Sequence, residues 1–163
     1  KLKLLTARGK FMEFIASEYL QEICVSASKT LLSLTGGRYY LKYDDEFKAG
    51  DNFNGGALRA VKTLSGGETF LVSLSLALAL SGAICAKSLR PIEFFFLDEG
   101  FGTLDEDTLD TALDTLAGLH RDGKLIGVIS HVAALKERIG TQIQVTPKTG
   151  GRSVVSGPGC SSV

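Results

Sequence analysis

The 163-residue sequence has no tryptophan, a single methionine, three prolines and three cysteines. Cys24, Cys85 and Cys160 share no C-x-x-C spacing, and an odd number of cysteines with no signal peptide argues against a disulfide framework. A reducing compartment is therefore expected, with the cytoplasm as the default. Because Met12 is the only methionine, Lys1 is not expected to be a natural start, and the chain is expected to be a piece of a longer protein.

The sequence also lacks net charge, since 18 basic side chains balance 18 acidic ones. The charges are nevertheless segregated along the chain: residues 1–43 carry +4, residues 44–92 carry 0, residues 93–122 carry −8 and residues 123–163 carry +4. An acidic centre between basic ends suggests a site that holds a ligand such as a cation. The alternative is a solvated acidic helix face, which charge alone favours.

Charge is missing altogether from residues 69–86, a stretch long enough to raise the question of a membrane span. The stretch contains Ser73, Ser75, Ser81 and Gly82, and no aromatic belt flanks it. A buried helix of a soluble α/β core has the same composition, so no membrane partner is expected. The hydrophobic content of 44% and the length suit one soluble domain with a real core, neither disordered nor collagen-like.

The hydrophobic pattern predicts an alternation of helices and strands. Apolar residues at three- and four-residue spacing predict a helix over residues 1–34 that Gly36 and Gly37 end. Strands are predicted at 38–43 and 58–62, with a loop from Ala49 to Gly56.

After Pro91, residues 92–97 form a short, largely apolar segment that suits a strand covered on both faces. A helix follows, with acids at 105–107 and a buried stripe at Leu109, Leu113 and Leu116. A strand at 125–130, a short helix after His131 and two final strands complete the chain. The pattern predicts an α/β fold with a largely parallel sheet.

Two polar pairs, Asp98-Glu99 and Ser130-His131, each follow an apolar strand. Ligands bind at the carboxyl ends of strands in open α/β sheets, so the two pairs are expected to face one crevice. Four apolar residues followed by two acids form a Walker B pattern, in which the first acid holds Mg²⁺ through water and the second orients the attacking water. The alternatives are that Asp98 and Glu99 only cap a turn, and that His131 is a bystander.

A second cluster, Leu64-Ser65-Gly66-Gly67-Glu68, precedes the uncharged stretch. The glycines allow a ligand to approach the backbone, and a helix that begins at Ser65 offers free N–H groups to phosphate. Ser65 and Glu68 also have the spacing of a capping box. Both interpretations can hold together, because a capped helix start is also an anion site.

A Walker A loop, the glycine-rich loop that binds nucleotide phosphates in proteins with a Walker B segment, is absent from the sequence. Gly118 to Leu125 imitates the spacing of its glycines and lysine, but Leu125 stands where a hydroxyl residue is required. The segment also runs from a helix into a strand, which reverses the required order, and Gly123 is read as a helix C-cap. These residues therefore do not supply the phosphate-binding loop.

Taken together, these motifs resemble those of ABC-type ATPases. The individual residues within the motifs most resemble those of the C-terminal ATPase lobe of the bacterial SbcC family, which is related to SMC proteins. Residues 64–68 match the signature motif, Phe94 to Glu99 the Walker B segment, Gly102 to Asp105 the D-loop, and His131 the switch histidine. The resemblance implies a P-loop NTPase-like head whose Walker A loop lies in a separate N-terminal lobe. Residues 1–34 would then be the base of a coiled coil and residues 35–163 the C-terminal lobe.

The resemblance also implies roles for individual residues. Two heads would sandwich two ATP molecules, with the signature residues of one head, above all Ser65 and Gly67, acting on the nucleotide of the other. Asp98 would support Mg²⁺, Glu99 would position the hydrolytic water and His131 would sense the γ-phosphate of their own head's nucleotide. Asp105 would lie at the seam between the heads, and Leu64, Gly66 and Glu68 would complete the signature site.

The partners implied are the N-terminal lobe, a second head, an SbcD-like nuclease subunit and double-stranded DNA, in a complex for DNA repair and recombination. An SMC-like DNA clamp and a transporter ATPase are the alternatives, the transporter being disfavoured by Gly100-Phe101-Gly102 and by the N-terminal helix. The basic residues of segment 1–43 could meet DNA phosphates, but a solvated coiled-coil face explains them equally well.

Overall fold

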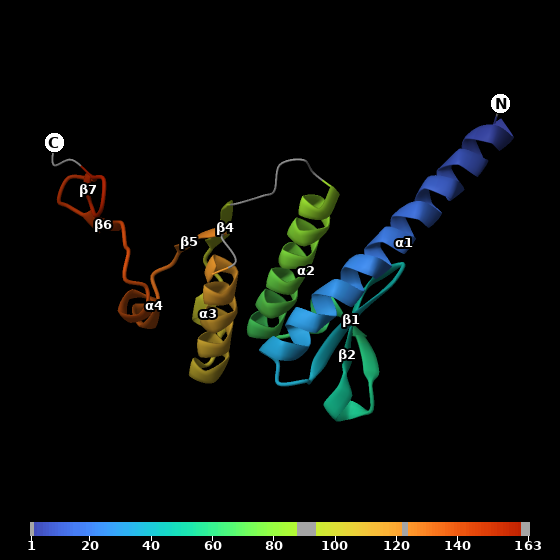
Figure 1. The fold of residues 1–163 in the computed structure, drawn as a ribbon, viewed down its shortest axis with the longest axis horizontal. Helices are drawn as coiled ribbons and strands as arrows, with labels where there is room; N and C mark the ends of the chain where they lie inside the picture. Colours follow the sequence, from blue (N-terminus) through green and yellow to red (C-terminus); the bar gives the residue numbers. More distant parts are fainter. Residues whose placement is uncertain (1, 88–93, 122–123, 161–163) are drawn as a thin grey trace. The chain divides into compact units, whose positions relative to one another are not determined.

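The structure is a computed structural model that describes residues 2–87, 94–121 and 124–160. The chain divides into two compact units, Lys1–Ile129 and Ser130–Val163, and Figure 1 labels the helices and strands of each. The first unit holds the signature, Walker B and D-loop motifs. The second unit begins with the Ser130-His131 pair.

The first unit opens with the long helix α1 (Leu2–Leu34), as the sequence predicts. It ends where Gly36 and Gly37 adopt φ of +57° and +85°, and the N–H of Gly37 donates to the carbonyl of Leu32 at 2.7 Å, which satisfies one of the last helical carbonyls. Its C-terminal half is anchored in the core by one stripe of buried side chains: Ile23, Cys24, Ala27, Leu31 and Leu34. Closer to its N-terminus, Phe11, Phe14 and Ile15 are exposed.

Three antiparallel strands follow in the order β1 (Tyr39–Asp44), β2 (Glu46–Asp51) and β3 (Ala57–Ala60). The strands predicted at 38–43 and 58–62 are confirmed with shifted ends, but the loop predicted from Ala49 to Gly56 is wrong at its start. There β2 continues to Asp51, and Gly50 pairs with Tyr40 of β1. A Cβ at Gly50 would lie 2.1 Å from Tyr40 Cζ, so this glycine belongs to a strand.

The uncharged stretch lies within α2 (Gly66–Lys87), which packs against α1 (Figure 1). Among the described residues, α2 is the one helix long and apolar enough to cross a membrane, a property that the core helix of a soluble protein shares. Its contacts with α1 bury one side of the helix. Its buried residues are Leu71, Val72, Leu74, Ser75, Ala79 and Ser81.

A parallel pair of strands carries the acidic motif. Strand β4 (Phe94–Asp98) pairs with β5 (Leu125–Ile129), and Asp98 is opposite Ile129. Residues 92 and 93 of the predicted strand lie outside the described residues, as does Gly123, for which a C-cap was predicted. Phe94 and Phe96 are 45% and 60% exposed, so the predicted cover on both faces is wrong for the described part of the chain.

Helix α3 (Glu106–Arg121) follows β4 through the short 3-10 turn η3 (Phe101–Thr103). Leu109 and Leu116 are buried as predicted, but Ala112 completes the buried stripe and Leu113 is only half-buried. The helix begins with Glu106 and Asp107 in its first turn, where the helix dipole favours acids.

The second unit contains helix α4 (Ala133–Arg138) and the antiparallel pair β6 (Gln144–Pro147) and β7 (Ser153–Ser156). The short helix after His131 and the two final strands are therefore confirmed. The α/β class is confirmed as well, and a parallel sheet is present. The parallel pair β4 and β5 accompanies two antiparallel sheets, so parallel pairing is less extensive in the described residues than the sequence suggested.

Candidate nucleotide-binding site

The signature loop forms the start of α2. The carboxylate of Glu68 accepts a hydrogen bond from the backbone N–H of Ser65 at 2.9 Å, and Ser65 Oγ accepts one from the N–H of Glu68 at 3.3 Å. The predicted capping box is thus confirmed. Because Ser65 Oγ is the acceptor of this bond, its hydroxyl can still rotate to donate to a ligand. Ser65 and Gly66 are exposed, and the first N–H groups of a helix have no carbonyl partner within the helix itself.

The D-loop lies directly against the signature loop. A Cβ at Gly67 would lie 2.8 Å from the carbonyl oxygen of Thr103 and 3.4 Å from Leu104 Cδ2, so only glycine permits this approach. The two loops and the end of α1 enclose a cavity of about 420 Å³, whose lining includes Ser65, Gly67, Glu68, Thr103, Leu104 and Asp105. The structure therefore brings together two motifs that are far apart in the sequence.

Asp105 has a structural role at the start of α3. Its Oδ1 accepts a hydrogen bond from the N–H of Thr108 at 2.9 Å, which caps the helix. The hydrogen bonds from Thr108 hold the pKa of Asp105 below its ordinary value, so this carboxylate stays ionised at neutral pH.

The two acids of the Walker B segment are exposed where β4 ends. Asp98 is the last residue of the strand, and its carboxylate makes no hydrogen bond or ion pair within the described parts of the chain. The N–H of Glu99 donates to the carbonyl of Ile129 at 2.9 Å, which extends the pairing with β5 by one residue. Glu99 itself adopts φ of +58° and Gly100 φ of +96°, so the chain turns sharply here.

The donor set around Asp98 suits a partly hydrated Mg²⁺. The described residues contain no group of three His, Cys, Asp or Glu side chains that could hold a metal ion by themselves. Magnesium in nucleotide sites keeps several waters and is bound through one or two carboxylates together with the phosphates. A single exposed carboxylate that has no partner in the described part of the chain fits that arrangement.

Ser130 and His131 belong to the second unit. Ser130 Oγ accepts a hydrogen bond from the N–H of Val132 at 3.2 Å. Because Asp98 and Glu99 lie in the other unit, the shared crevice stays a prediction.

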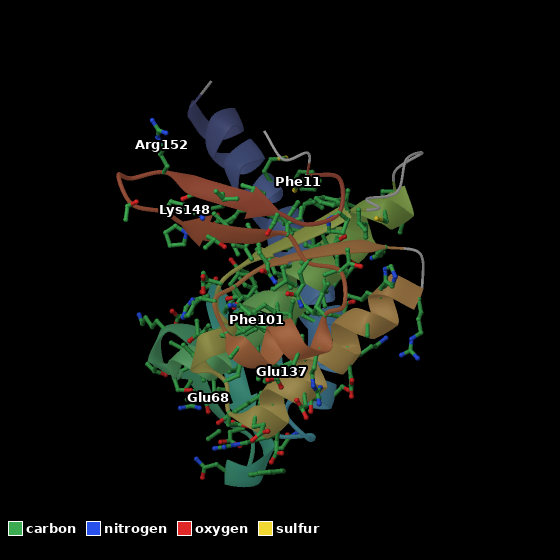
Figure 2. All side chains as sticks on the ribbon, turned by 90° about the vertical axis from the view of Figure 1, so that its left-hand side faces the viewer. Phe11, Glu68, Phe101, Glu137, Lys148 and Arg152 are labelled. Atoms are coloured by element: carbon green, nitrogen blue, oxygen red, sulfur yellow. The ribbon has the colours of Figure 1, made fainter. Side chains whose placement is uncertain are left out.

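Sequence reasoning missed a polar network that holds Glu68. Tyr39 Oη donates to Glu68 Oε1 at 2.5 Å, and Arg59 Nη2 donates to Tyr39 Oη at 3.0 Å and to Glu68 Oε2 at 3.2 Å. The guanidinium of Arg59 also lies 5.4 Å from the centre of the Tyr39 ring. Glu68, which Figure 2 labels, also lines the cavity beside the signature loop. Tyr39 is 29 residues away from Glu68, so no local pattern could have revealed the contact.

The network sets the ionisation of its members. Burial alone would raise the pKa of Glu68, but the hydrogen bonds from Tyr39 and Ser65 and the charge of Arg59 outweigh it and hold that pKa below its ordinary value. Burial and the bond to Glu68 raise the pKa of Tyr39. The capping carboxylate therefore stabilises the loop above the ordinary carboxyl pKa, and this stabilisation is lost as the pH falls through the lowered pKa.

We expect Tyr39→Phe to lower the free energy of unfolding by about 1–2 kcal/mol, because it removes a buried hydrogen bond to a charged group and leaves the ring in place. Thermal denaturation of the ATPase head, followed by circular dichroism, measures the loss. Tyr43→Phe is the matched control on the same strand, since the hydroxyl of Tyr43 makes no hydrogen bond within the described residues. Equal denaturation midpoints for the two variants would show that the Tyr39 hydroxyl contributes nothing.

Comparisons with known proteins agree with these motifs. Residues 33–118 match the family model described as SbcC/RAD50-like, Walker B motif. The chain is 47% identical over 144 residues to the SbcC subunit of the nuclease SbcCD from Clostridium acetobutylicum, an alignment that covers 87% of this chain and 12% of that protein. It is 48% identical over 149 residues to the corresponding SbcC protein of Bacillus subtilis, covering 90% of this chain and 13% of that protein. The chain thus spans about an eighth of the length of these relatives.

Solved structures share the fold. A structure described as part of the structural biochemistry of ATP-driven dimerization and DNA-stimulated activation of SMC ATPases superimposes with a TM-score of 0.67 at 19% identity, covering 88% of this chain and 87% of that one. The SMC head domain of Thermotoga maritima gives 0.58 at 24% identity, covering 84% and 47%. The family model covers more than half of the chain, and the chain belongs to the SbcC/RAD50-like family.

Proposed function

We propose that the chain is the C-terminal lobe of the ATPase head of an SbcC-type nuclease subunit, and that it hydrolyses ATP only when assembled with a Walker A lobe and a second head. The observation that carries the proposal is the signature loop, a capped and exposed helix start held against the D-loop. Such a start offers N–H groups and a hydroxyl to phosphate oxygens, as a γ-phosphate site requires.

The acids at the end of β4 would serve the nucleotide of their own head. Asp98 would hold Mg²⁺ through water, and the bound ion would neutralise charge on the phosphate oxygens. Glu99 would orient the attacking water and accept its proton, and His131 would sense the γ-phosphate. Ser65, Gly66 and Gly67 would act on the nucleotide held by the partner head, with Asp105 near the seam.

Uncovered apolar side chains support the need for another lobe. Phe94 and Phe96 on β4 and Leu80 and Ile84 on α2 are all at least 40% exposed. The rings of Phe94 and Phe96 contact each other with centres 4.5 Å apart, and contiguous exposed apolar side chains often mark a surface that a partner covers. An N-terminal lobe with its own strands and Walker A loop would cover these side chains and supply the missing phosphate-binding loop.

The assembled protein would act with an SbcD-like nuclease subunit on double-stranded DNA in the cytoplasm, with ATP gating the engaged head dimer. The names of the relatives support a nuclease complex over a transporter or an SMC-like clamp. Manganese-dependent cleavage of linear DNA by the full-length protein and its natural partner would distinguish the nuclease role from the clamp.

We expect the 163-residue chain alone to hydrolyse no ATP above background, because its sequence lacks the phosphate-binding loop. Mixing it with the separately produced N-terminal lobe should restore hydrolysis, measured as phosphate release. The same mixture with Glu99→Gln is the control that assigns the activity to this site. Robust turnover by the chain alone would contradict the proposal.

A further inference from the structure

The backbone at Glu99 is held in a conformation that such a residue rarely adopts. Glu99 is one of two non-glycine residues with positive φ among the described residues, at +58°. Residues other than glycine, asparagine and aspartate seldom adopt a positive φ, so surrounding contacts must maintain this backbone conformation. The direction in which the Cα–Cβ bond of Glu99 leaves the backbone therefore depends on the contacts that fix this turn.

One wall of the turn is the ring of Phe70, which lies on α2. A Cβ at Gly100 would lie 2.3 Å from Phe70 Cδ2 and 2.5 Å from Cε2, so the ring touches the backbone next to Glu99. The rings of Phe70 and Phe101 meet edge to face with centres 4.8 Å apart. Phe101 is 1% exposed and is the largest fully buried side chain among the described residues (Figure 2).

Phe70 belongs to the helix that begins with the signature loop. It follows Ser65 by five residues within α2, whose first turn is fixed by the capping box. A second contact joins the same elements, since Gly67 packs against the carbonyl of Thr103, and Thr103 Oγ1 donates to the carbonyl of Gly100 at 2.8 Å. A shift of the signature loop therefore moves the wall against which the Glu99 turn rests.

We propose that Phe70 is a positioning residue for Glu99, through which the signature helix of each head sets the orientation of that head's own water-activating acid. The inference rests on the proposed function and adds a residue to it. The ring of Phe70 contacts the chain at Gly100 and Phe101, so the role assigned to it is to hold the turn and not to bind the nucleotide. Its effect is on the chemical step and not on the binding of ATP, so kcat should change while KM is preserved.

The test uses full-length protein with its nuclease partner. Phe70→Leu keeps an apolar side chain but removes the flat wall, and kcat for ATP should fall about tenfold with KM within about twofold, the scale expected for a small misplacement of a catalytic group. Val72→Ala is the matched control, because Val72 is buried on the same helix α2 but lies two positions after Phe70, about 200° around the helix axis and so on the opposite side. It should lower the denaturation midpoint as much as Phe70→Leu and leave kcat near wild type.

A double variant separates positioning from a merely structural role. If Phe70 acts through Glu99, adding Phe70→Leu to Glu99→Gln should not lower the residual single-turnover rate further. An equal fold-loss in both backgrounds, or a wild-type kcat in Phe70→Leu, would overturn the inference. Should Phe70→Leu fail to fold, Phe70→Met is measured by the same criteria. Wild-type hydrolysis by Glu99→Gln alone would instead reject the proposed function, so the two failures are distinguishable.

Discussion

Glu99→Gln in the complete protein is expected to lower the rate of ATP hydrolysis by about two to four orders of magnitude, the usual contribution of a general base. Glutamine keeps the size and hydrogen-bonding geometry of the side chain but cannot accept a proton from water. ATP binding should persist, because Glu99 lies at the turn after β4 and is not among the residues proposed to hold the phosphates. Heads that bind ATP without hydrolysing it should accumulate as dimers, which size-exclusion chromatography with ATP and Mg²⁺ detects.

Glu106→Gln is the matched control for this experiment. Glu106 is another exposed acid in the same segment, in the first turn of α3, and it should be replaceable with little effect on kcat. A Glu99→Gln protein that hydrolyses ATP at the wild-type rate would remove Glu99 from the mechanism. Loss of hydrolysis without any ATP-dependent dimer would assign it a role other than positioning water.

The parts predicted from sequence are those encoded by neighbouring residues. The capping box at Ser65 and Glu68 needs only a three-residue spacing and an apolar helix after it, and the structure contains it. Helix α1 follows from its periodicity and the two glycines after it. The acidic segment from 93 to 122 contains both the exposed pair Asp98-Glu99 at the end of β4 and the acids in the first turn of α3. Because both a candidate site and a helix face contribute acids, the net charge of the segment could not distinguish between them.

The parts that the sequence could not reveal depend on contacts between distant residues. Strand β2 was missed because Gly50 looks like a loop residue until the ring of Tyr40 is seen above it. The hydrogen bonds from Tyr39 and Arg59 to Glu68 join β1, β3 and α2, and no sequence spacing predicts them. The contact between Phe70 and Gly100 also joins residues that are distant in the sequence. Taken separately, the pattern around Phe70 indicates only a helix core position, and the pattern around Gly100 indicates only a turn.

Ser65→Ala should lower ATP hydrolysis by about 100-fold in a dimer of identical heads, because the transition state loses one positioned donor. The substitution also removes the N-cap of α2, at a cost of about 1 kcal/mol in stability. Ser65→Thr, which keeps a hydroxyl and a capping oxygen, is the control for that structural cost. Retained activity in Ser65→Thr together with loss in Ser65→Ala assigns the effect to the hydroxyl.

Mixed dimers test whether Ser65 serves the nucleotide of the other head. If it does, pairing a Ser65→Ala head with a Glu99→Gln head leaves one site with both groups intact, and hydrolysis should persist at a fraction of the wild-type rate. Pairing a head that carries both substitutions with a wild-type head damages both sites, so hydrolysis should fall to that of the Ser65→Ala or Glu99→Gln dimers. The heads carry two different affinity tags so that only mixed dimers are assayed. The opposite ranking of the two pairs would mean that Ser65 and Glu99 act on the same head's nucleotide, because only then does the wild-type partner keep a complete site.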